Sequence, residues 1–544
     1  MMNNNDNWNL NEYIAYWTKY LERNIERFDN PDPEKTKYIR QLDELMIFKY
    51  GASVNIKLNH ILQEIYNGTY SDEHHTNRYK QTDICLIQQG LSINQDDNLI
   101  VKSLSNKDIF CIQGPPGTGK TTIITEIVLQ LLKANPDSRI LICSETHVAV
   151  DNALLRITDE VKRLNWNNIK ICRYPKYNNS TVIPEDNCTS FSYHLGIACN
   201  HIQRNDLNLA KNIASYIKKE NGYDREFENL VISKMNVLGI TCNQLARFKI
   251  AGSLDIPYDV AIIDEVSKAT FPEIIIPLNR CNKAIFVGDP MQLPPTFCRE
   301  EIEIMDILSE EQQETTEYII NKSVVDRIFN NIDKDSISFL DTQYRMSKQI
   351  GDIVSSLFYE GKLKDGRKYS DQNSVEWLNY RTEEKFPKKP IRDGGVLQNE
   401  IEASIIIKTI QDRFANNNNK FIAIITPYIK QKRYIENLLN KLNILDKKQY
   451  EVNTIDAYQG READIVFISF VRNTGSGRFF SDLRRVNVAI SRAKDKVFFV
   501  GMVQYLEQHL RKLLYLVKNM HLVDITDDNE LPIKLTEQSN QLEC

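Results

Sequence analysis

The sequence has no long hydrophobic run, no cysteine pair of the CxxC type and little net charge. Its apolar stretches fall well short of the roughly 20 residues that cross a bilayer, which excludes an ordinary membrane-spanning helix. Ten scattered cysteines indicate reduced thiols rather than a disulfide framework. The first residues, MMNNNDNWNL, lack the basic and apolar segments of a signal peptide. We therefore expect a soluble cytoplasmic protein.

The weak overall charge also restricts the kind of partner. With a formal net charge of −5 over 544 residues, the body as a whole does not attract nucleic acid. A groove for a polyanion must then be a local basic patch. The remaining composition, 42% hydrophobic and 26% charged residues, is ordinary for a globular protein. A chain of this length is too long for one core and indicates two to four domains.

One glycine-rich stretch carries a strong chemical signal. Residues 108–122 read DIFCIQGPPGTGKTT, which is a short apolar run, a turn and the start of a segment with helical spacing. Glycines let the backbone N–H groups approach phosphates, and the following helix adds positive field. In this pattern Lys120 reaches the β- and γ-phosphates and the Thr121 hydroxyl ligates Mg²⁺. The predicted triphosphate site comprises Gly114, Pro115, Pro116, Gly117, Thr118, Gly119, Lys120, Thr121 and Thr122.

A second apolar run, VAIIDE, ends in the carboxylates of Asp264 and Glu265. At a strand end, Asp264 is placed to hold Mg²⁺ through water, and Glu265 to orient and deprotonate an attacking water. Acidic residues also occur at strand ends for structural reasons, but this pair lies downstream of a phosphate loop. The two patterns together predict hydrolysis of a nucleoside triphosphate with Mg²⁺.

The first 88 residues have helical patterns. One apolar stripe with spacings of three and four predicts a helix that stops before Pro31 and Pro33: Leu10, Ile14, Trp17, Leu21, Ile25 and Phe28. A second stripe consists of Ile39, Leu42, Leu45 and Met46. We interpret the two as a helical hairpin packed on the rest of the chain. A separate module that binds a protein partner is the alternative.

Strand-like apolar runs then form a first series, which predicts a doubly wound parallel sheet. Its members are Ile109–Ile112, Ile140–Cys143, Val237–Cys242, Val260–Ile263 and Ala284–Val287. Residues from about 153 to 232 interrupt the series and are expected to form a largely helical insertion, with a helix at Leu207–Lys219. A cluster inside the insertion matches no common zinc spacing, so metal binding is the less favoured interpretation: Cys188, His194, Cys199 and His201.

A second series of strand-like runs begins near Ser336 and has no phosphate loop. It comprises Phe339-Leu340, Phe421–Ile425, Ile465–Phe470 and Val497–Val500. Two sheets with a single phosphate loop suggest a nucleotide cleft between two lobes. We expect the polar stretch Lys362–Asp393 to be a surface excursion, Asn416–Asn419 to be a loop tip, and the residues after about Asp524 to be a polar tail.

Six motifs occur in order and resemble those of superfamily 1B helicases, in the group that contains senataxin and the nonsense-mediated-decay helicase. They are GPPGTGKT at Gly114, DE at Asp264, GDPMQL at Gly288, QYRM at Gln343, VNTIDAYQGREAD at Val452 and RRVNVAISRAK at Arg484. The resemblance covers residues 89–505 and leaves the first 88 residues and the tail uncovered. It implies two RecA-like parallel-sheet P-loop NTPase domains, an α/β fold, to which the residue patterns described above add a helical N-terminal region and a helical insertion.

The resemblance also implies nucleotide contacts from both halves of the chain: Gln95 at the adenine, Tyr344 stacked on the base, Gln292 as γ-phosphate sensor, Arg345 and Arg492 as arginine fingers, Glu462 at the ribose and Gly460 near the phosphates. A planar, permanently charged guanidinium suits the charge that builds on phosphoryl oxygens. An isolated arginine is more often a surface ion pair, but each of these two lies within a matching string.

Other matching positions imply contacts to a nucleic-acid backbone. They are Ser144, Thr146, Thr241, Pro427, Tyr428 and Thr454, with Thr426, Lys430, Lys432 and Arg433 beside them. Hydroxyl, ammonium and guanidinium groups can pair with phosphates in any sequence context. For each threonine, a helix-cap role is the structural alternative. Because phosphate contacts do not report on the 2′-OH, the choice between RNA and DNA stays open.

Two departures from the family pattern bear on mechanism. Lys268 stands where the family usually has glutamine, and residues 50–90 are too short for the β-barrel of larger members. The resemblance implies an ATP-dependent translocase that travels 5′→3′ on a single strand. An ATP-switched clamp that does not unwind is the rival, and a scaffold without turnover is disfavoured. The expected domains are 1–88, 89–334, 335–515 and a tail at 516–544.

Overall fold

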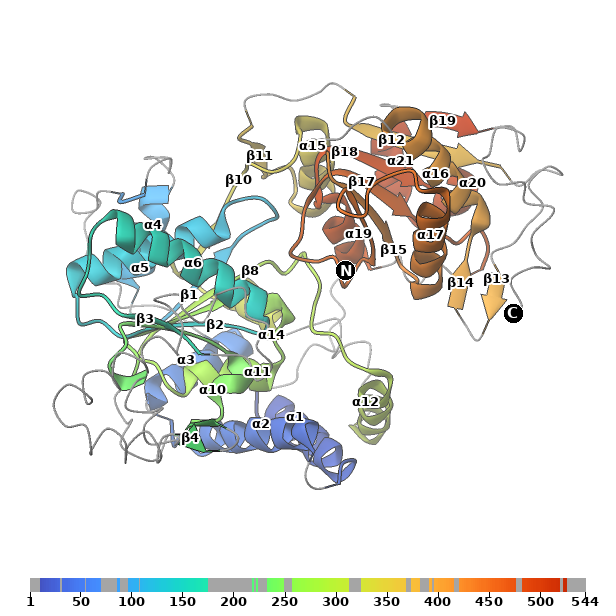
Figure 1. Cartoon of the computed structure of the whole chain (residues 1–544). Coiled ribbons are helices and arrows are strands. Elements are labelled where there is room, and N and C mark those ends of the chain that lie inside the picture. The colour runs from blue at the N-terminus through green and yellow to red at the C-terminus, as the bar shows by residue number, and fades with distance from the viewer. Residues whose placement is uncertain are drawn as a thin grey trace. The chain divides into compact units, whose positions relative to one another are not determined.

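The computed structural model describes the chain in segments: residues 10–29, 32–53, 55–69, 86–88, 96–106, 108–174, 218–219, 222–223, 232–248, 257–312, 324–367, 373–381, 391–393, 396–414, 420–475, 482–518 and 522–525. They form two compact units, the first made chiefly of residues up to Phe339 and the second chiefly of residues from Leu340 onwards. Figure 1 shows an α/β fold with a twisted sheet in each. No helix in these segments combines the length and the apolar character needed to cross a membrane.

Three helices open the chain: α1 (Leu10–Glu26), α2 (Pro33–Lys49) and α3 (Ile56–Asn67). The predicted stripe of α1 is confirmed, because Leu10, Ile14, Trp17 and Leu21 are buried. Pro33 begins α2 rather than only ending α1, since a proline at the first helical position gives up no hydrogen bond. Asp32 caps the same turn by accepting from the Glu34 N–H at 2.7 Å.

The predicted stripe of α2 is confirmed for Leu45, which is buried, and for Leu42, which packs against the core, but it is wrong for Ile39. Ile39 is 39% exposed, and the buried face comprises Tyr38, Gln41, Glu44, Leu45 and Phe48. Polar side chains point inward here because each finds a partner. Gln41 Nε2 donates to Asn243 Oδ1 at 2.8 Å, and Glu44 forms a buried ion pair with Arg280. A hydrophobicity pattern cannot show such a face.

The first unit holds a seven-stranded parallel sheet in the order β3-β6-β2-β7-β8-β1-β9. The strands are β1 (Ile109–Gln113), β2 (Ile140–Ser144), β3 (Ile171–Arg173), β6 (Val237–Thr241), β7 (Val260–Asp264), β8 (Ala284–Gly288) and β9 (Ile337–Phe339). Its helices are α4 (Asp96–Ser105), α5 (Lys120–Ala134), α6 (His147–Arg163), α10 (Cys242–Leu245), α11 (Phe271–Leu278), α12 (Arg299–Gln312) and α14 (Val324–Asn331). The doubly wound parallel sheet is therefore confirmed.

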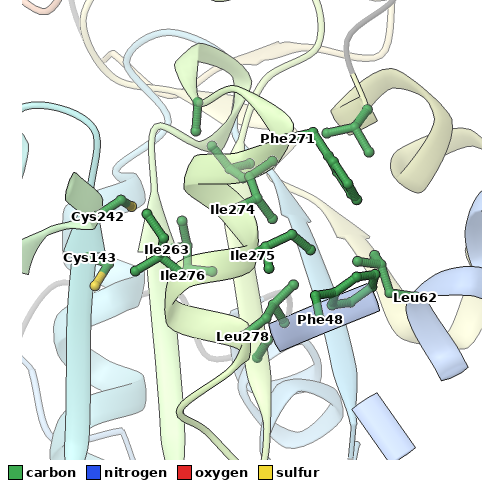
Figure 2. Packing of buried hydrophobic residues seen from close by; sticks show 14 of the residues in the cluster. Phe48, Leu62, Cys143, Cys242, Ile263, Phe271, Ile274, Ile275, Ile276 and Leu278 are labelled. Atoms are coloured by element: carbon green, nitrogen blue, oxygen red, sulfur yellow. The ribbon is translucent and has the colours of Figure 1, made fainter. Parts of the chain in front are cut away.

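Helix α11 is buried over its whole length, and it joins the sheet to the N-terminal helices. It contacts α2 and β7, and Ile274, Ile275 and Ile276 are fully buried. Figure 2 shows Ile275 on the side of Phe48 from the N-terminal helices, and Ile276 on the opposite side beside Ile263 of β7. The N-terminal helices thus share the core of the first unit, as the hairpin interpretation expected.

Three local expectations for this unit were wrong. The sheet pattern does not stop near residue 153, because α6 runs to Arg163 and β3 pairs with β6. Lys218–Lys219 is strand β4, paired antiparallel with β5 (Gly222–Tyr223), rather than the end of a helix. The expected Phe339-Leu340 strand belongs to the first sheet, as edge strand β9 beside β1. Cys188, His194, Cys199, His201 and the Asn416–Asn419 tip lie outside the described residues.

The second unit holds a six-stranded parallel sheet in the order β16-β15-β17-β18-β12-β19. The strands are β12 (Val375–Tyr380), β15 (Ile422–Thr426), β16 (Tyr450–Thr454), β17 (Ala463–Ser469), β18 (Ala493–Val500) and β19 (Leu522–Ile525). Its helices are α15 (Lys348–Phe358), α16 (Glu400–Phe414), α17 (Ile429–Leu442), α19 (Leu483–Ile490), α20 (Val503–Leu506) and α21 (Arg511–Lys518). Short pairs are β10 (Thr342–Gln343) with β11 (Lys364–Asp365), and β13 (Ile391–Asp393) with β14 (Val396–Gln398).

Strand β12 overturns the expectation that Lys362–Asp393 is a surface excursion. It lies between β18 and β19, and Trp377 is fully buried against Phe470 and Phe499. The charged Glu376 hid this strand in the sequence. Its carboxylate is buried because Arg413 and Lys496 both pair with it.

Candidate nucleotide and nucleic-acid sites

The phosphate loop joins β1 to α5, as its sequence predicted. Gly117 (φ 75°) and Gly119 (φ 82°) adopt the left-handed conformation that glycine tolerates best. Gly119 is also the N-cap of α5, and it has no side chain to occupy the first-turn amides. The Lys120 ammonium folds back over the loop and donates to the Gly114 carbonyl at 2.8 Å. The loop therefore has the turn, the helix start and the cation that bind a phosphate.

The acidic pair lies at the carboxyl end of β7 in the same unit. Asp264 is 5% exposed, and burial together with the neighbouring Glu265 carboxylate raises its pKa to about 6. Lys120 opposes this shift in pKa electrostatically, which relates the phosphate loop to the acidic strand end. A nearby cation would stabilise the ionised form of Asp264 further.

Glu265 has an unusual backbone and a local partner. Its φ of 52° lies in the left-handed region, and its N–H donates to Asp264 Oδ1 at 2.8 Å. The following turn (Val266–Lys268) returns Lys268 to it, with Nζ 2.7 Å from Glu265 Oε2. Both side chains are about one-fifth exposed. The departure from the family pattern at residue 268 thus contacts the carboxylate predicted to act as base.

The segment that carries Gln292 follows β8 and is tied to the acidic turn. Ser267 donates its hydroxyl to the Asp289 carbonyl at 3.0 Å and accepts from the Asp289 N–H at 2.8 Å. These two bonds hold Asp289, the second residue of the GDPMQL string, against Ser267.

In the second unit, the two predicted arginine fingers come together. Arg345 Nε donates to Glu462 Oε2 at 2.8 Å and its Nη1 to the Ser491 carbonyl at 3.2 Å. Arg492 is 2% exposed and donates to the Val488 carbonyl at 2.9 Å and to Ser491 Oγ at 3.1 Å. Residues 345, 462 and 492 are far apart in sequence, so only the fold of this unit joins them.

Glu462 has a second cation, Lys494, whose Nζ lies 2.8 Å from Oε1. Partial burial raises its pKa, but Lys494 and Arg345 outweigh that effect and hold the pKa of Glu462 below its usual range. Gly460, two residues earlier, has a φ of 83° and open space where a Cβ would lie. A ligand could approach the backbone closely at this position.

The turn that carries Tyr344 and Arg345 is stabilised by hydrogen bonds to the buried side chain of Gln343. Gln343 is fully buried, and its Oε1 accepts the N–H groups of Arg345 at 2.9 Å and Met346 at 2.7 Å. The Tyr344 ring lies against Gly366, where a Cβ would collide with it at 2.4 Å, and Tyr344 is 56% exposed. Gln95, the predicted adenine contact, lies outside the described residues.

The predicted nucleic-acid residues of the first unit meet at one sheet edge. Ser144 and Thr241 are partners in register at the ends of β2 and β6. Thr146 caps α6 by accepting from Ala149 N at 3.4 Å, and Thr241 caps α10 by accepting from Gln244 N at 3.3 Å. The helix-cap alternative is therefore correct for both threonines, which does not prevent a backbone phosphate from approaching the same edge.

The second unit shows the same arrangement at the ends of β15 and β16. Thr426 and Thr454 are partners in register, and Pro427 and Tyr428 lead into α17. The Tyr428 hydroxyl accepts from Arg472 Nε at 2.6 Å. The motif matches did not include Arg472. It lies three residues past the end of β17, the strand beside β15, and that position was the only sequence signal for it.

Comparisons with known proteins agree with this arrangement. Two family models, each described as AAA domain, match the chain, one over residues 92–222 and 198–300 and the other over residues 320–504. An uncharacterized ATP-dependent helicase of Methanocaldococcus jannaschii is 28% identical in an alignment that covers 80% of this chain and 71% of the relative.

Two further relatives carry specific names. DNA polymerase alpha-associated DNA helicase A of Saccharomyces cerevisiae is 27% identical, over 78% of this chain and 67% of its own length. Regulator of nonsense transcripts 1 of Caenorhabditis elegans is 26% identical, over 77% of this chain and 38% of its own length. The chain thus spans about two thirds of some relatives and less than half of others.

Proposed function

We propose that this chain, which belongs to the superfamily 1 helicases in the group that includes Regulator of nonsense transcripts 1, is an ATP-dependent helicase or translocase on single-stranded nucleic acid. The observation that carries the proposal is the first unit's strand–loop–helix, with Lys120 folded 2.8 Å from Gly114 and the acidic pair at a strand end of the same sheet. The relatives named as ATP-dependent or DNA helicases support the choice of ATP.

On this proposal, the loop from Gly114 to Thr122 cradles the triphosphate and Lys120 neutralises its β- and γ-oxygens. The Thr121 hydroxyl and the Asp264 carboxylate are the oxygen donors that suit Mg²⁺, and the raised pKa of Asp264 fits a site that a cation completes. The bound ion would supply charge neutralisation for the phosphoryl group. Glu265 orients the water and accepts its proton.

The second unit supplies guanidinium groups in the same proposal. Arg345 and Arg492 stabilise charge on the γ-phosphoryl oxygens, Tyr344 and Gln95 bind the base, and Glu462 binds the ribose close to Gly460. Gln292 reports the γ-phosphate. Ser144, Thr146, Thr241, Pro427, Tyr428 and Thr454 line the path of the strand. The expected bounds at 334 and 515 are wrong, because β9 extends the first sheet to Phe339 and β19 extends the second to Ile525. The proposed direction is 5′→3′.

One observation favours a second candidate, an ATP-switched clamp with slow turnover. The Lys268 ammonium is paired with Glu265, the proposed base, and a base that is held by a cation is less available to water. A clamp would hydrolyse ATP slowly and would not release strands from a partial duplex. A helicase would do both at matched rates, so strand displacement measured beside ATPase turnover separates the two.

The decisive experiment compares ATPase rates with single-stranded RNA, single-stranded DNA and no nucleic acid, at one stated salt concentration. Lys120→Ala is expected to abolish turnover. Lys133→Ala is the matched control, because Lys133 lies exposed in the last turn of the same helix and should keep the wild-type rate. Stimulation by neither polymer would contradict the proposal.

A further inference from the structure

Val471 has a strained backbone in a fully buried position. Its φ is 69°, in the left-handed region, and its side chain is 0% exposed. A β-branched residue rarely adopts this conformation, because its Cβ substituents crowd the backbone. Such strain persists only where the surroundings impose it, and it is concentrated at functional sites. The surroundings of Val471 therefore call for an explanation.

A buried polar network imposes the conformation. The Val471 N–H donates to Glu402 Oε2 at 2.8 Å, and its carbonyl accepts from Asn399 Nδ2 at 2.8 Å. Ser469 donates its hydroxyl to the same Glu402 oxygen at 2.7 Å. Gln431 of α17 exchanges two hydrogen bonds with the Asn399 backbone, at 2.8 and 3.0 Å. All these side chains are buried, so the network holds the two peptide groups that flank the Val471 Cα firmly.

The conformation of Val471 sets the direction of the next residue. Arg472 lies half-buried beside Tyr428, with Nε 2.6 Å from the phenol oxygen and its guanidinium carbon 5.8 Å from the ring centre. Tyr428 follows β15 and Arg472 follows β17, and these are neighbouring parallel strands (Figure 1). The two side chains thus meet at the carboxyl edge of the sheet, where open α/β sheets bind ligands.

The chemistry of Arg472 suits an oxyanion. A guanidinium has five N–H donors in a planar fork, and the bond to Tyr428 uses one of them. Burial raises the pKa of Glu402 to about 8, against the hydrogen bonds it accepts, so the carboxyl below Val471 is largely neutral at pH 7. It therefore offers no full negative charge that would compete for the guanidinium.

We propose that Arg472 contacts a phosphate of the single-stranded nucleic acid, and that Glu402 and Asn399 position it by holding Val471 in the left-handed conformation. This inference rests on the proposed function. It adds a binding residue outside the matching motifs, and it explains the left-handed backbone of Val471 as a means of orienting Arg472. Because RNA and DNA carry the same phosphate group, Arg472 should act equally on both.

The test of the contact is the salt dependence of binding. Binding of a labelled homopolymer single strand, of ribose and of deoxyribose type, is followed by fluorescence anisotropy over a range of salt concentrations. Arg472→Gln should reduce the slope of log Kd against log salt by about 0.7, which is roughly fivefold in Kd at about 0.1 M salt. Both polymers should weaken by the same factor.

Lys447→Gln is the matched control. Lys447 is exposed before β16, at the amino edge of the same sheet, so its variant removes one positive charge away from the proposed contact. Its slope should equal that of the wild type. An unchanged slope in Arg472→Gln, with a salt-dependent wild type, would overturn this inference and leave the proposed function intact. A wild type that binds no single strand would overturn both.

The positioning role needs a readout that simple loosening of the fold would not give. Val471→Gly permits the backbone to leave the imposed conformation, and it should weaken binding in the wild-type background. In the Arg472→Gln background it should add no further loss, because the two residues act as one unit. Glu402→Gln, which keeps an acceptor for the Val471 N–H, should bind like the wild type. Equal losses from Val471→Gly in both backgrounds would overturn the positioning role.

Discussion

The two units hold their proposed catalytic charges in different ways. In the first unit, Glu265 is paired with Lys268, three residues further along the chain. In the second, Arg345 is paired with Glu462, which is 117 residues away. Each pair joins a charged group to an opposite charge of its own unit. On the proposed function, each group shares or exchanges this internal partner when a triphosphate binds.

The difference in chain separation has a physical consequence. Lys268 and Glu265 lie on one short turn, so their pair survives any rearrangement that leaves the turn intact. The pair of Arg345 with Glu462 depends on two segments that only the second sheet brings together. The first pair thus sets a constant electrostatic environment, whereas the second can open when its segments shift.

The largest effects are expected when the charges themselves are removed. Glu265→Gln and Arg345→Gln should each lower kcat for ATP hydrolysis by about 10³-fold, since both groups would act on charge that develops in the transition state. Because groups that work as a unit are not additive, the double variant should lose little more than either single variant. Steady-state ATPase assays measure all three.

The control for Arg345 is Lys348→Gln. Lys348 is exposed and paired with Asp352 on α15, so its loss should leave kcat unchanged. Wild-type turnover in Arg345→Gln would show that the arginine only pairs with Glu462. The second unit would then hold no catalytic charge at Arg345, and the comparison between the two units would no longer apply.

A second contrast lies in the cores. The first unit buries both partners of the ion pair between Arg280 and Glu44, whereas the buried Glu402 of the second unit accepts from neutral groups, the Ser469 hydroxyl and the Val471 N–H. Arg280→Met should destabilise the first unit by about 3–5 kcal/mol, because it leaves the Glu44 carboxylate buried without its charge partner. Adding Glu44→Leu should restore most of the loss. Urea unfolding, followed by hydrogen exchange in α2 and α11, measures the free energy of unfolding of each variant. A double variant as unstable as Arg280→Met alone would contradict the charge argument.

The Glu402 network predicts a pH dependence confined to the second unit. Burial raises the pKa of Glu402 from 4.5 to about 8, so the folded state keeps a proton that the unfolded chain releases between these values. The resulting stability is full below pH 4.5 and falls by about 1.4 kcal/mol per pH unit as the pH rises towards 8. Hydrogen exchange of β12 and β17 should show this slope in the wild type. Glu402→Gln should remove it, and a persisting slope would assign it to another group.

The smallest effect is expected at Lys268. Lys268→Gln removes the cation from Glu265 and should raise kcat without nucleic acid by up to about fivefold, which is the range of a partly exposed ion pair. Rising salt should narrow the gap between wild type and variant, because salt screens the pair. A drop in kcat would show instead that Lys268 supports the catalytic geometry.

Local patterns predicted the parts of the fold that depend on neighbouring residues. The strand, glycine turn and helix from Ile109 to Ala134 appear as expected, because backbone freedom at Gly117 and Gly119 is a property of those residues alone. The apolar runs formed parallel strands as predicted, because hydrophobicity is likewise a property of the residues in each short segment. Strand β12 was missed because Glu376 is buried only through Arg413 and Lys496, which are distant in sequence.

The amino-acid sequence by itself determined the phosphate loop, the acidic strand end, the family and the presence of two parallel sheets, since short segments encode each of these. The tertiary structure alone decided that Glu44 faces inward, that β9 joins the first sheet, that Glu462 holds Arg345 and that a buried acid strains Val471. Each of these depends on contacts between residues far apart in the chain. Such contacts exist only after the sheets have formed, because burial supplies the partners that make a polar or strained residue tolerable.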